Sequence, residues 1–354
     1  MLRRKSGKSV FFDIKTMGAH RRSYQIIQQF LYCGYTCYIR FPYNYYREME
    51  HYGKKIIHLK KVYFSNKKNK FSITVSGSED FLNQQNCDKK ILFSIKLFQI
   101  LPDITDKDFF APPLLHPNLF FPETEKKIYS EAFANISQSR PVAAIFVGNV
   151  NNVLSNDRTD NTTYNLDATK KDFNIYTRVE LFKYIYEELF ENVYLPASYE
   201  ELTQKIKTGE LKNKIVLIDT KVCKIPQKYL LKTLLQTNFF IYMPGFWQPY
   251  CHNHIESMLA GCIPVTQFNR FYLNYFQHQH NALLFNEIHE LKPLLQNIIA
   301  GKYEENLAEM RKNILELYLQ KFSFEAFRIK LSEALASKSH TLNYYTPPTV
   351  NMNK

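Results

Sequence analysis

Short apolar runs alternate with amphipathic segments along most of this chain. In the N-terminal part, apolar runs predict strands over 10–14 and 35–41, and an apolar period near 3.6 residues predicts a helix over 24–32 between them. Gly34 is expected to end that helix, because glycine adopts the left-handed backbone of a helix terminus at no steric cost. The order strand, helix, strand predicts a parallel pair, since parallel strands need a crossover connection.

Less regular elements follow in the N-terminal part. Runs over 56–64, 71–75 and 91–95 predict further strands. The segment 109–122 is rich in proline and cannot form a regular helix.

A second series of elements begins with an apolar strand over 142–150 and a polar loop over 151–171. The residues after it predict alternating helices and strands with short connections: helix 178–191, strand 193–195, helix 198–208, strand 214–218, helix 225–237, strand 239–243 and strand 263–267. Such alternation predicts a largely parallel sheet that is covered on both faces. We therefore expect two doubly wound α/β domains, with ligands at the carboxyl ends of the strands.

The length of 354 residues also favours two domains, because single hydrophobic cores stop growing near roughly 250 to 300 residues. We expect an N-terminal domain over 1–138 and a C-terminal domain over 139–301. Two helices over 302–338, interrupted near 322–324, are expected to pack back on the N-terminal domain. Residues 339–354 are expected to be disordered.

The composition is that of a folded globular protein, with 45% hydrophobic and 22% charged residues. The net charge of +13 favours anionic partners, such as phosphorylated substrates or an anionic membrane surface. A general bias toward lysine is the alternative explanation. The basic clusters at 2–8, 54–70 and 170–171 belong to no recognisable nucleic-acid module, so no nucleic-acid partner is expected.

No run approaches the roughly 18 apolar residues of a membrane span, and the first residues, MLRRKSGKSVFFDI, lack the apolar core of a signal peptide. We therefore expect a cytoplasmic protein whose basic patches allow peripheral contact with the cytoplasmic membrane face. The six cysteines show no zinc-ligand spacing and imply no disulfide framework, so buried thiols are expected.

The most informative stretch is Phe239–Pro264, FFIYMPGFWQPYCHNHIESMLAGCIP. A short apolar strand breaks at Pro244 and Gly245, and a polar loop leads into a helix. A helix N-terminus offers unpaired N–H groups and the positive end of the helix dipole, and glycine lets the backbone approach a ligand closely. The pattern predicts that Gly245 and the turn 252–253 face a phosphate group.

Three segments, HNHIESMLAGCIPV (252–265), NALLF (281–285) and FSFEAF (322–327), resemble motifs of GT-B-fold glycosyltransferases in their order along the chain. The form beginning at Pro249 is most similar to exostosin-like and bacterial surface-polysaccharide transferases. The resemblance covers about residues 214–330. It implies two Rossmann-like domains that face a central cleft, with the nucleotide-sugar on the C-terminal domain, the acceptor on the N-terminal domain, and neither metal nor other cofactor.

The resemblance implies that Glu256 accepts hydrogen bonds from two ribose hydroxyls of the nucleotide. From the residues alone, a helix-capping acid that the helix dipole stabilises is the favoured explanation, and only the resemblance reverses this preference. Many retaining members carry another Glu eight residues earlier, where this chain has Gln248. An amide can hydrogen-bond a sugar hydroxyl but supplies no charge, so the donor sugar and the stereochemistry stay open.

Other candidate donor-binding residues lie at strand ends. Gly148 and Asn149 close the strand 142–150, where the backbone can approach a diphosphate. Lys221 and His252 are candidates for offsetting the negative charge that builds on the diphosphate as the bond to the sugar breaks. The alternatives are an ordinary turn at Gly148 and a solvated lysine at 221.

Asn253 is a further candidate donor-binding residue, and the alternative is that it only caps the helix. His20 and His116 are candidate general bases for the acceptor hydroxyl, since an unperturbed histidine pKa is near 6.5. A structural role is the alternative for both. Asp13, in the first strand, is expected to be too buried to reach substrate.

Asp106-Lys107-Asp108 has the form of a metal-binding DxD motif but lies in a polar linker, so we interpret it as a solvated turn. No metal is expected.

The sequence thus predicts a glycosyltransferase that moves a sugar from a nucleotide-sugar to a hydroxyl of a surface glycan or lipid-linked acceptor. The alternatives are a non-catalytic binding module on the same fold and a sugar-nucleotide hydrolase or epimerase.

Overall fold

The structure, a computed structural model, describes residues 8–17, 20–40, 51–65, 71–95, 108–110, 115–116, 118–150, 175–245, 251–267, 269–272 and 274–346. The chain forms two compact units: the first is Met1–Pro122 with Gln320–Lys354, and the second is Glu123–Leu319. Two separate segments of the chain therefore make up the first unit. The expected boundaries at 138 and 301 fall inside the second unit.

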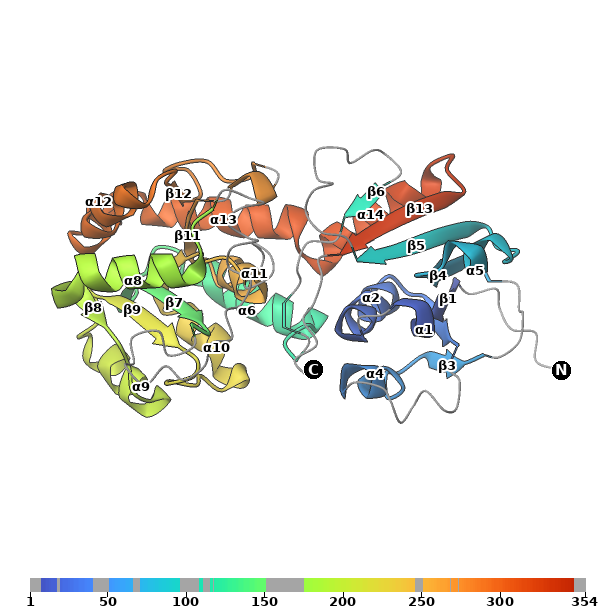
Figure 1. Cartoon of the computed structure of the whole chain (residues 1–354), viewed down its shortest axis with the longest axis horizontal. Coiled ribbons are helices and arrows are strands. Elements are labelled where there is room, and N and C mark those ends of the chain that lie inside the picture. Colours follow the sequence, from blue (N-terminus) through green and yellow to red (C-terminus); the bar gives the residue numbers. More distant parts are fainter. Residues whose placement is uncertain are drawn as a thin grey trace. The chain divides into compact units, whose positions relative to one another are not determined.

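The first unit contains a seven-stranded sheet in the order β3-β2-β1-β4-β5-β13-β6 (Figure 1). All of its pairings are parallel. Its strands are β1 (Ser9–Asp13), β2 (Thr36–Ile39), β3 (Val62–Phe64), β4 (Ile73–Ser76), β5 (Lys89–Ile95), β6 (Asp108–Phe110) and β13 (Thr341–Thr346). The chain order reverses between the neighbours β1 and β4, which makes this pair a topological switch point.

Helices cover this sheet and share its core. The helices of the first unit are α1 (Ile14–Met17), α2 (His20–Tyr32), α4 (His51–Ile56), α5 (Glu79–Asn83) and α14 (Phe324–Ala336). Phe30 of α2 packs edge-to-face on Phe12 of β1 and on Phe327 of α14, with ring centroids 5.4 and 5.9 Å apart. The α14 helix joins this core although it lies near the other end of the chain.

Two sequence predictions for the first unit are wrong. The run 56–64 is not one strand, because α4 ends at Ile56 and Lys61 has a φ of 63°, which interrupts any extended run before β3. The tail is not disordered over its whole length, because Thr341–Thr346 forms β13 between β5 and β6. Asp108 begins β6, and the other two residues of the DxD triplet lie outside the described residues.

The second unit contains a six-stranded parallel sheet in the order β12-β11-β10-β7-β9-β8 (Figure 1). Its strands are β7 (Val142–Gly148), β8 (Val193–Tyr194), β9 (Ile215–Asp219), β10 (Thr237–Ile241), β11 (Ile263–Thr266) and β12 (Leu283–Leu284). Every residue of β7 and β9 is buried, as expected for strands that are covered on both faces.

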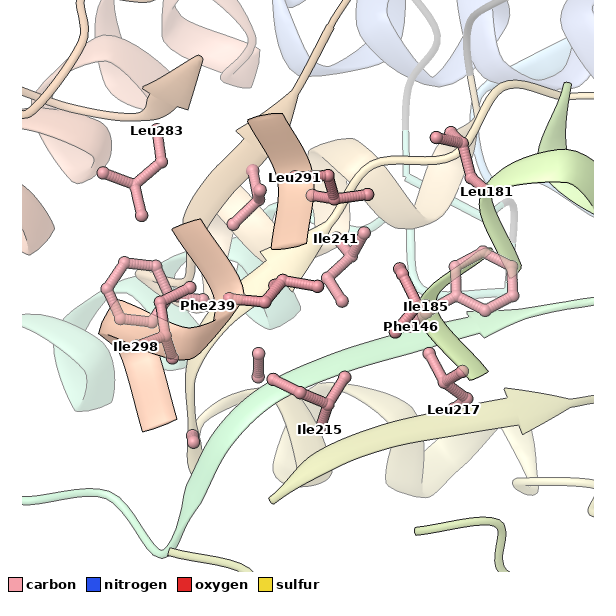
Figure 2. Close-up of a cluster of buried hydrophobic side chains, with 14 of the residues drawn as sticks. Phe146, Leu181, Ile185, Ile215, Leu217, Phe239, Ile241, Leu283, Leu291 and Ile298 are labelled. Atoms are coloured by element: carbon pink, nitrogen blue, oxygen red, sulfur yellow. The ribbon is translucent and has the colours of Figure 1, made fainter. Parts of the chain in front are cut away.

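The helices of the second unit are α6 (Pro122–Ala134), α8 (Arg178–Glu188), α9 (Tyr199–Thr208), α10 (Gln227–Leu234), α11 (His252–Leu259), α12 (Ile288–Ile299) and α13 (Leu307–Lys321). Short 3-10 turns occur at Phe190–Asn192, Asn269–Tyr272 and Glu304–Asn306. Figure 2 shows the core between the sheet and two of these helices, with Phe146, Ile215, Leu217, Phe239 and Ile241 from strands, Leu181 and Ile185 from α8, and Leu291 and Ile298 from α12.

The helices after residue 301 divide between the units, which corrects the expectation that both pack on the N-terminal domain. In α13, Met310 belongs to the core of the second unit, and the Tyr318 hydroxyl donates to Glu125 Oε2 of α6 at 2.8 Å. In α14, Leu331 belongs to the core of the first unit.

Local capping explains why several helices begin where they do. Thr177 and Glu180 form a reciprocal capping box at the start of α8, and Ser198 and Ser323 cap α9 and α14. Gly209 ends α9 with a φ of 75°. Both units are doubly wound parallel α/β structures, so the predicted pair of Rossmann-like domains is confirmed.

Candidate functional site

The candidate site lies at the carboxyl edge of the second sheet. The chain passes from β7 to β8 and β9 on one side and returns through β10 on the other, so β7 and β10 form a topological switch point. In open parallel sheets, ligands bind outside the carboxyl ends of the strands at such a point. The segments after β7, β9 and β10 and the start of α11 therefore form the candidate site.

Asp219, the last residue of β9, organises two of these segments. Its Oδ1 accepts from the backbone N–H of Val150, after β7, at 3.2 Å and from that of Lys221 at 3.0 Å. The N–H of Thr220 donates to the Gly148 carbonyl at 3.0 Å. The turns after β7 and β9 are thus fixed to each other, and Lys221, whose side chain is exposed, follows directly.

Gly148 ends β7 at a point with no room for a side chain. A Cβ built there would lie 2.6 Å from Cζ of Phe146 and 3.2 Å from Nη1 of Arg178. Because the ring of Phe146 is itself buried, it has little freedom to move away. Glycine is required here by close packing, which is more specific than the ordinary strand-end turn considered from the sequence.

Arg178, in the first turn of α8, joins the segments around the switch point. Its guanidinium donates from Nε to the Pro244 carbonyl at 2.9 Å, from Nη1 to the Asn149 carbonyl at 3.1 Å, and from Nη2 to Cys251 Sγ at 2.9 Å. The residue is 6% exposed and its guanidinium lies 5.7 Å from the centroid of the Phe146 ring. A buried cation therefore sits beneath the segments that were expected to face a diphosphate.

Sequence reasoning did not assign a role to Arg178. The available signal was its position, since a cation in the first turn of a helix opposes the helix dipole and is unfavourable there. Such a placement indicates another task for the charge. The three acceptors of Arg178 lie on distant segments and only the fold brings them together.

Asn253 is not the N-cap of α11, which corrects one interpretation of the sequence. The N-cap is Cys251, and Asn253 lies one residue inside the helix. Its Nδ2 donates to the Val147 carbonyl of β7 at 2.5 Å. Asn253 thus fixes the first turn of α11 against the carboxyl end of β7. This contact directs the helix N-terminus at the carboxyl edge of the sheet.

His252 and Glu256 form a pair along one side of α11. His252 Nδ1 lies 3.2 Å from both carboxylate oxygens of Glu256, whose side chain has no exposed surface, whereas the histidine side chain is 35% exposed. The imidazole therefore covers a buried carboxylate.

His254 is a structural histidine behind this pair. Its ring stacks on Tyr242 with centroids 4.1 Å apart, its Nδ1 lies 2.7 Å from the Tyr272 hydroxyl, and its Nε2 lies 3.2 Å from the Met243 carbonyl. Because a carbonyl only accepts, Nε2 carries the proton and Nδ1 accepts from Tyr272. Burial and the nearby Arg178 charge lower the pKa of His254 well below its ordinary value, so the ring is neutral at pH 7.

Most predicted donor-binding residues belong to this carboxyl edge: Gly148, Asn149, Lys221, Gly245, His252, Asn253 and Glu256. Gly245 lies next to Pro244, whose carbonyl binds Arg178. Gln248 lies outside the described residues. The parallel pairing of β9, β7 and β10 is what brings the others together.

The two candidate bases lie in the first unit. His20 is the first residue of α2. His116 Nδ1 accepts from the Asn118 N–H at 3.2 Å, and its Nε2 lies 3.4 Å from the Tyr52 hydroxyl. The only lone pair of a neutral His116 is therefore engaged by a backbone donor, and this bond would have to open before the ring could accept a proton.

Asp13 has no exposed surface, as expected from its place in β1. Its carboxylate accepts from Arg40 Nε at 2.9 Å and from the Thr16 hydroxyl at 3.1 Å. In the part of the chain that the structure describes, no group of three or more His, Cys, Asp or Glu side chains is arranged to hold a metal ion. No described helix is long and apolar enough to span a membrane.

No family model matches this chain, and no curated protein matches it. Among solved structures, a glycosyltransferase from Rickettsia africae matches 95% of this chain and 100% of its own, with a TM-score of 0.48 and 9% identity. HepE from Anabaena in complex with UDP matches 93% of this chain and 99% of its own, with a TM-score of 0.47 and 12% identity.

A third similar structure is a sucrose-phosphate synthase from Thermosynechococcus elongatus. It matches 92% of this chain and 98% of its own, with a TM-score of 0.41 and 11% identity. Doubly wound folds host many unrelated activities, so similarity at this level does not establish what this chain does. Evidence for the activity of this chain therefore has to come from its site residues.

Proposed function

We propose that this chain is a glycosyltransferase that moves a sugar from a nucleotide-sugar to an acceptor hydroxyl. The observation that carries the proposal is the convergence, at one switch point, of the N-terminus of α11 and the buried cation Arg178, which lies against Gly148, with the carboxylate of Glu256 on the same helix α11. The helix N-terminus and the cation suit a diphosphate, and the carboxylate suits a pair of ribose hydroxyls.

In this proposal, nucleotide binding exchanges the partner of Glu256. The two ribose hydroxyls donate to the carboxylate in place of His252, which now lies 3.2 Å from it. The freed imidazole, together with Lys221, then donates toward the diphosphate. Negative charge builds there as the bond from the anomeric carbon to the diphosphate oxygen breaks, and the acceptor oxygen bonds to the same carbon as its proton passes to a base.

We also propose that protein cations replace a metal ion in this role, and that the acceptor is a surface glycan or lipid-linked saccharide. The support for an acceptor at a membrane surface is the net charge of +13. Binding to vesicles with and without anionic lipid tests the membrane contact. Activity that survives dialysis against a chelator tests the metal-independent mechanism.

The ribose assignment is tested by a double cycle in calorimetry. Nucleoside diphosphates are screened for binding, and the best of them is compared with its 2′-deoxy form on the wild type and on Glu256→Ala. Loss of a hydrogen bond to a charged group costs about 1.5 to 3 kcal/mol, so the wild type should bind the deoxy form at least about tenfold more weakly. Glu256→Ala should bind both forms equally.

Glu187→Ala, which removes an exposed carboxylate of α8, is the matched control and should behave as the wild type. A wild-type protein that does not distinguish the two nucleotides would rule out the ribose assignment. Product analysis with a panel of nucleotide-sugars separates the function classes. Nucleotide release without a new glycoside indicates a hydrolase, and binding without release indicates a non-catalytic module.

A further inference from the structure

The α2 helix of the first unit has a polar face that is buried. Arg22, Gln25 and Gln29 are spaced as i, i+3 and i+7, which places them on one side of the helix. Their exposed fractions are 8%, 1% and 2%. The polar side of an amphipathic helix normally faces water, so a buried one needs polar partners.

Two of the polar side chains have partners in the same unit. Gln25 Nε2 donates to the Leu115 carbonyl at 2.7 Å, and the Tyr344 hydroxyl of β13 donates to Gln29 Oε1 at 3.4 Å. These bonds place the polar face of α2 between β13 and the segment that contains Leu115. The helix starts shortly after β1 ends, so its first turn lies at the carboxyl edge of the sheet.

Arg22 is the member of this face whose guanidinium is only partly hydrogen-bonded. Its Nη1 donates to Gln25 Oε1 at 3.2 Å, and its Nε is buried without a hydrogen-bond partner. None of the ion pairs in the described part of the chain involves Arg22. Its pKa falls to about 9, first through burial and then through the like charge of Arg21.

Two other buried arginines, Arg311 and Arg178, have more hydrogen-bond acceptors than Arg22, although Arg311 also has a buried Nε without a partner. Arg311 donates from Nη1 to the carbonyls of Ile136 and Gln138, each at 2.7 Å, and from Nη2 to Asn238. Arg178 likewise has three acceptors. Arg22 has one neutral amide oxygen, and it sits in the first turn of a 13-residue helix, where the dipole adds to the positive potential.

We propose that Arg22 binds an oxyanion, a phosphate or carboxylate group, that the acceptor carries. The guanidinium forms paired hydrogen bonds with either group, and Nε is one of the two donors that such a pair uses. This inference rests on the proposed function in one respect, namely that the first unit holds the acceptor. The acceptor is then an anionic saccharide or lipid-linked saccharide rather than a neutral one.

The first experiment measures thermal unfolding of the full chain with inorganic phosphate and, separately, with acetate as probes. An anion that binds only the folded state raises Tm, and we expect a rise of about 2 °C or more for the wild type with at least one probe. Arg22→Met should lose this rise. Without any anion, Arg22→Met should be about as stable as the wild type, because removal of an uncompensated buried charge offsets the loss of the Arg22–Gln25 hydrogen bond.

The stability readout separates binding from a structural role. A structural arginine would make Arg22→Met less stable in the absence of anions, and that result would overturn the proposal. So would a wild type whose Tm responds to neither probe, or an Arg22→Met protein that keeps the full response. Arg328→Met, which removes an exposed arginine paired with Glu325 in the same unit, is the matched control and should keep the response.

A second measurement separates the two possible sources of the anion. The nucleoside diphosphate that binds best to the wild type is titrated into Arg22→Met by calorimetry, and its affinity should stay within about twofold. A tenfold loss would assign the oxyanion to the donor and overturn the acceptor assignment. Failure of the proposed function looks different, because then no nucleoside diphosphate binds the wild type while the response of Tm to phosphate or acetate can persist.

Discussion

The Nε of Arg178 donates to the carbonyl oxygen of Pro244 at 2.9 Å, which joins the first turn of α8 to the segment after β10. The same guanidinium reaches the Asn149 carbonyl after β7. One buried cation therefore sets the spacing between the two segments that flank the switch point. It supplies positive potential there without a solvated side chain that would have to be ordered on binding.

Replacing Arg178 with lysine should weaken both the fold and the site. Lysine keeps the charge but cannot reach three acceptors that a planar guanidinium contacts at once. We expect the free energy of unfolding to fall by about 2 to 3 kcal/mol and the affinity for the nucleoside diphosphate to fall at least about tenfold. Urea unfolding and calorimetry measure the two effects.

The matched control is Arg328→Lys in the first unit, where the side chain is exposed and pairs with Glu325. Its stability should change by less than about 0.5 kcal/mol. If Arg178→Lys binds nucleotide as the wild type does while losing stability, Arg178 acts only on the fold.

A substitution of Gly148 by alanine tests the close packing at the end of β7. The new Cβ would lie 2.6 Å from Phe146 Cζ, so the ring must shift, and Arg178 lies against that ring. Overpacking of this kind costs about 1 to 3 kcal/mol. We expect weaker nucleotide binding together with this loss of stability.

Gly209→Ala provides the comparison, because Gly209 has a φ of 75° but nothing within 4 Å of its built Cβ. Gly209 is the C-cap of α9. Alanine at this position would hold a left-handed backbone conformation at a cost of about 1 kcal/mol. Equal losses of nucleotide affinity in both variants would mean that Gly148 has no specific part in the site.

Much of this site followed from the sequence, and the reason is local. Glu256 and His252 are four residues apart on one helix, so their neighbourhood is fixed by helix geometry alone. Gly148 could be named because a glycine at a strand end is a local signal. Arg178 could not, because its acceptors, at Pro244 and Asn149, come together only when β7 and β10 pair.

His254 predicts a pH dependence of stability. Burial, with the Arg178 charge, lowers its pKa in the folded state, so the unfolded chain binds a proton near pH 6.5 that the folded chain does not. The contribution of His254 to the free energy of unfolding is therefore fully present above about pH 6.5 and is lost as the pH falls below that value. The loss is up to about 1.4 kcal/mol per pH unit until the pKa of the folded state is reached.

Urea unfolding at pH 7.5, 6.5 and 5.5 measures this slope. His254→Gln should show a smaller slope below pH 6.5 and lower stability at pH 7.5, because the bond to Tyr272 or Met243 is lost. His289→Gln, an exposed histidine of α12, should keep the wild-type slope. Identical slopes for wild type and His254→Gln would show that another group controls the pH dependence.

The β13 strand was hidden in the sequence for a related reason. Thr341–Thr346 is rich in β-branched and aromatic residues, which favour a strand, but it lies in a tail near prolines and far along the chain from any partner. Its partners are β5, through six residue pairs, and β6, through three. Pairing across such a separation leaves no periodic signal in the sequence.

Removing β13 should therefore destabilise the first unit. A chain that ends at Ser339 loses the buried side chains Leu342 and Tyr344, and burial of two such side chains contributes about 3 to 6 kcal/mol, a large part of the stability of a typical domain. It also exposes the edge of β5, which promotes aggregation. We expect a sharp fall in soluble yield and an early unfolding transition.

A chain that ends at residue 349 keeps all of β13 and is the control. Nucleotide binding supplies a further readout, because every donor-binding residue proposed here lies in the second unit. Any soluble fraction of the shorter chain should bind the nucleoside diphosphate within about threefold of the wild type. If instead the chain ending at Ser339 unfolds as the full chain does, β13 contributes nothing to the first sheet, and the core around Tyr344 has to be assigned to other strands.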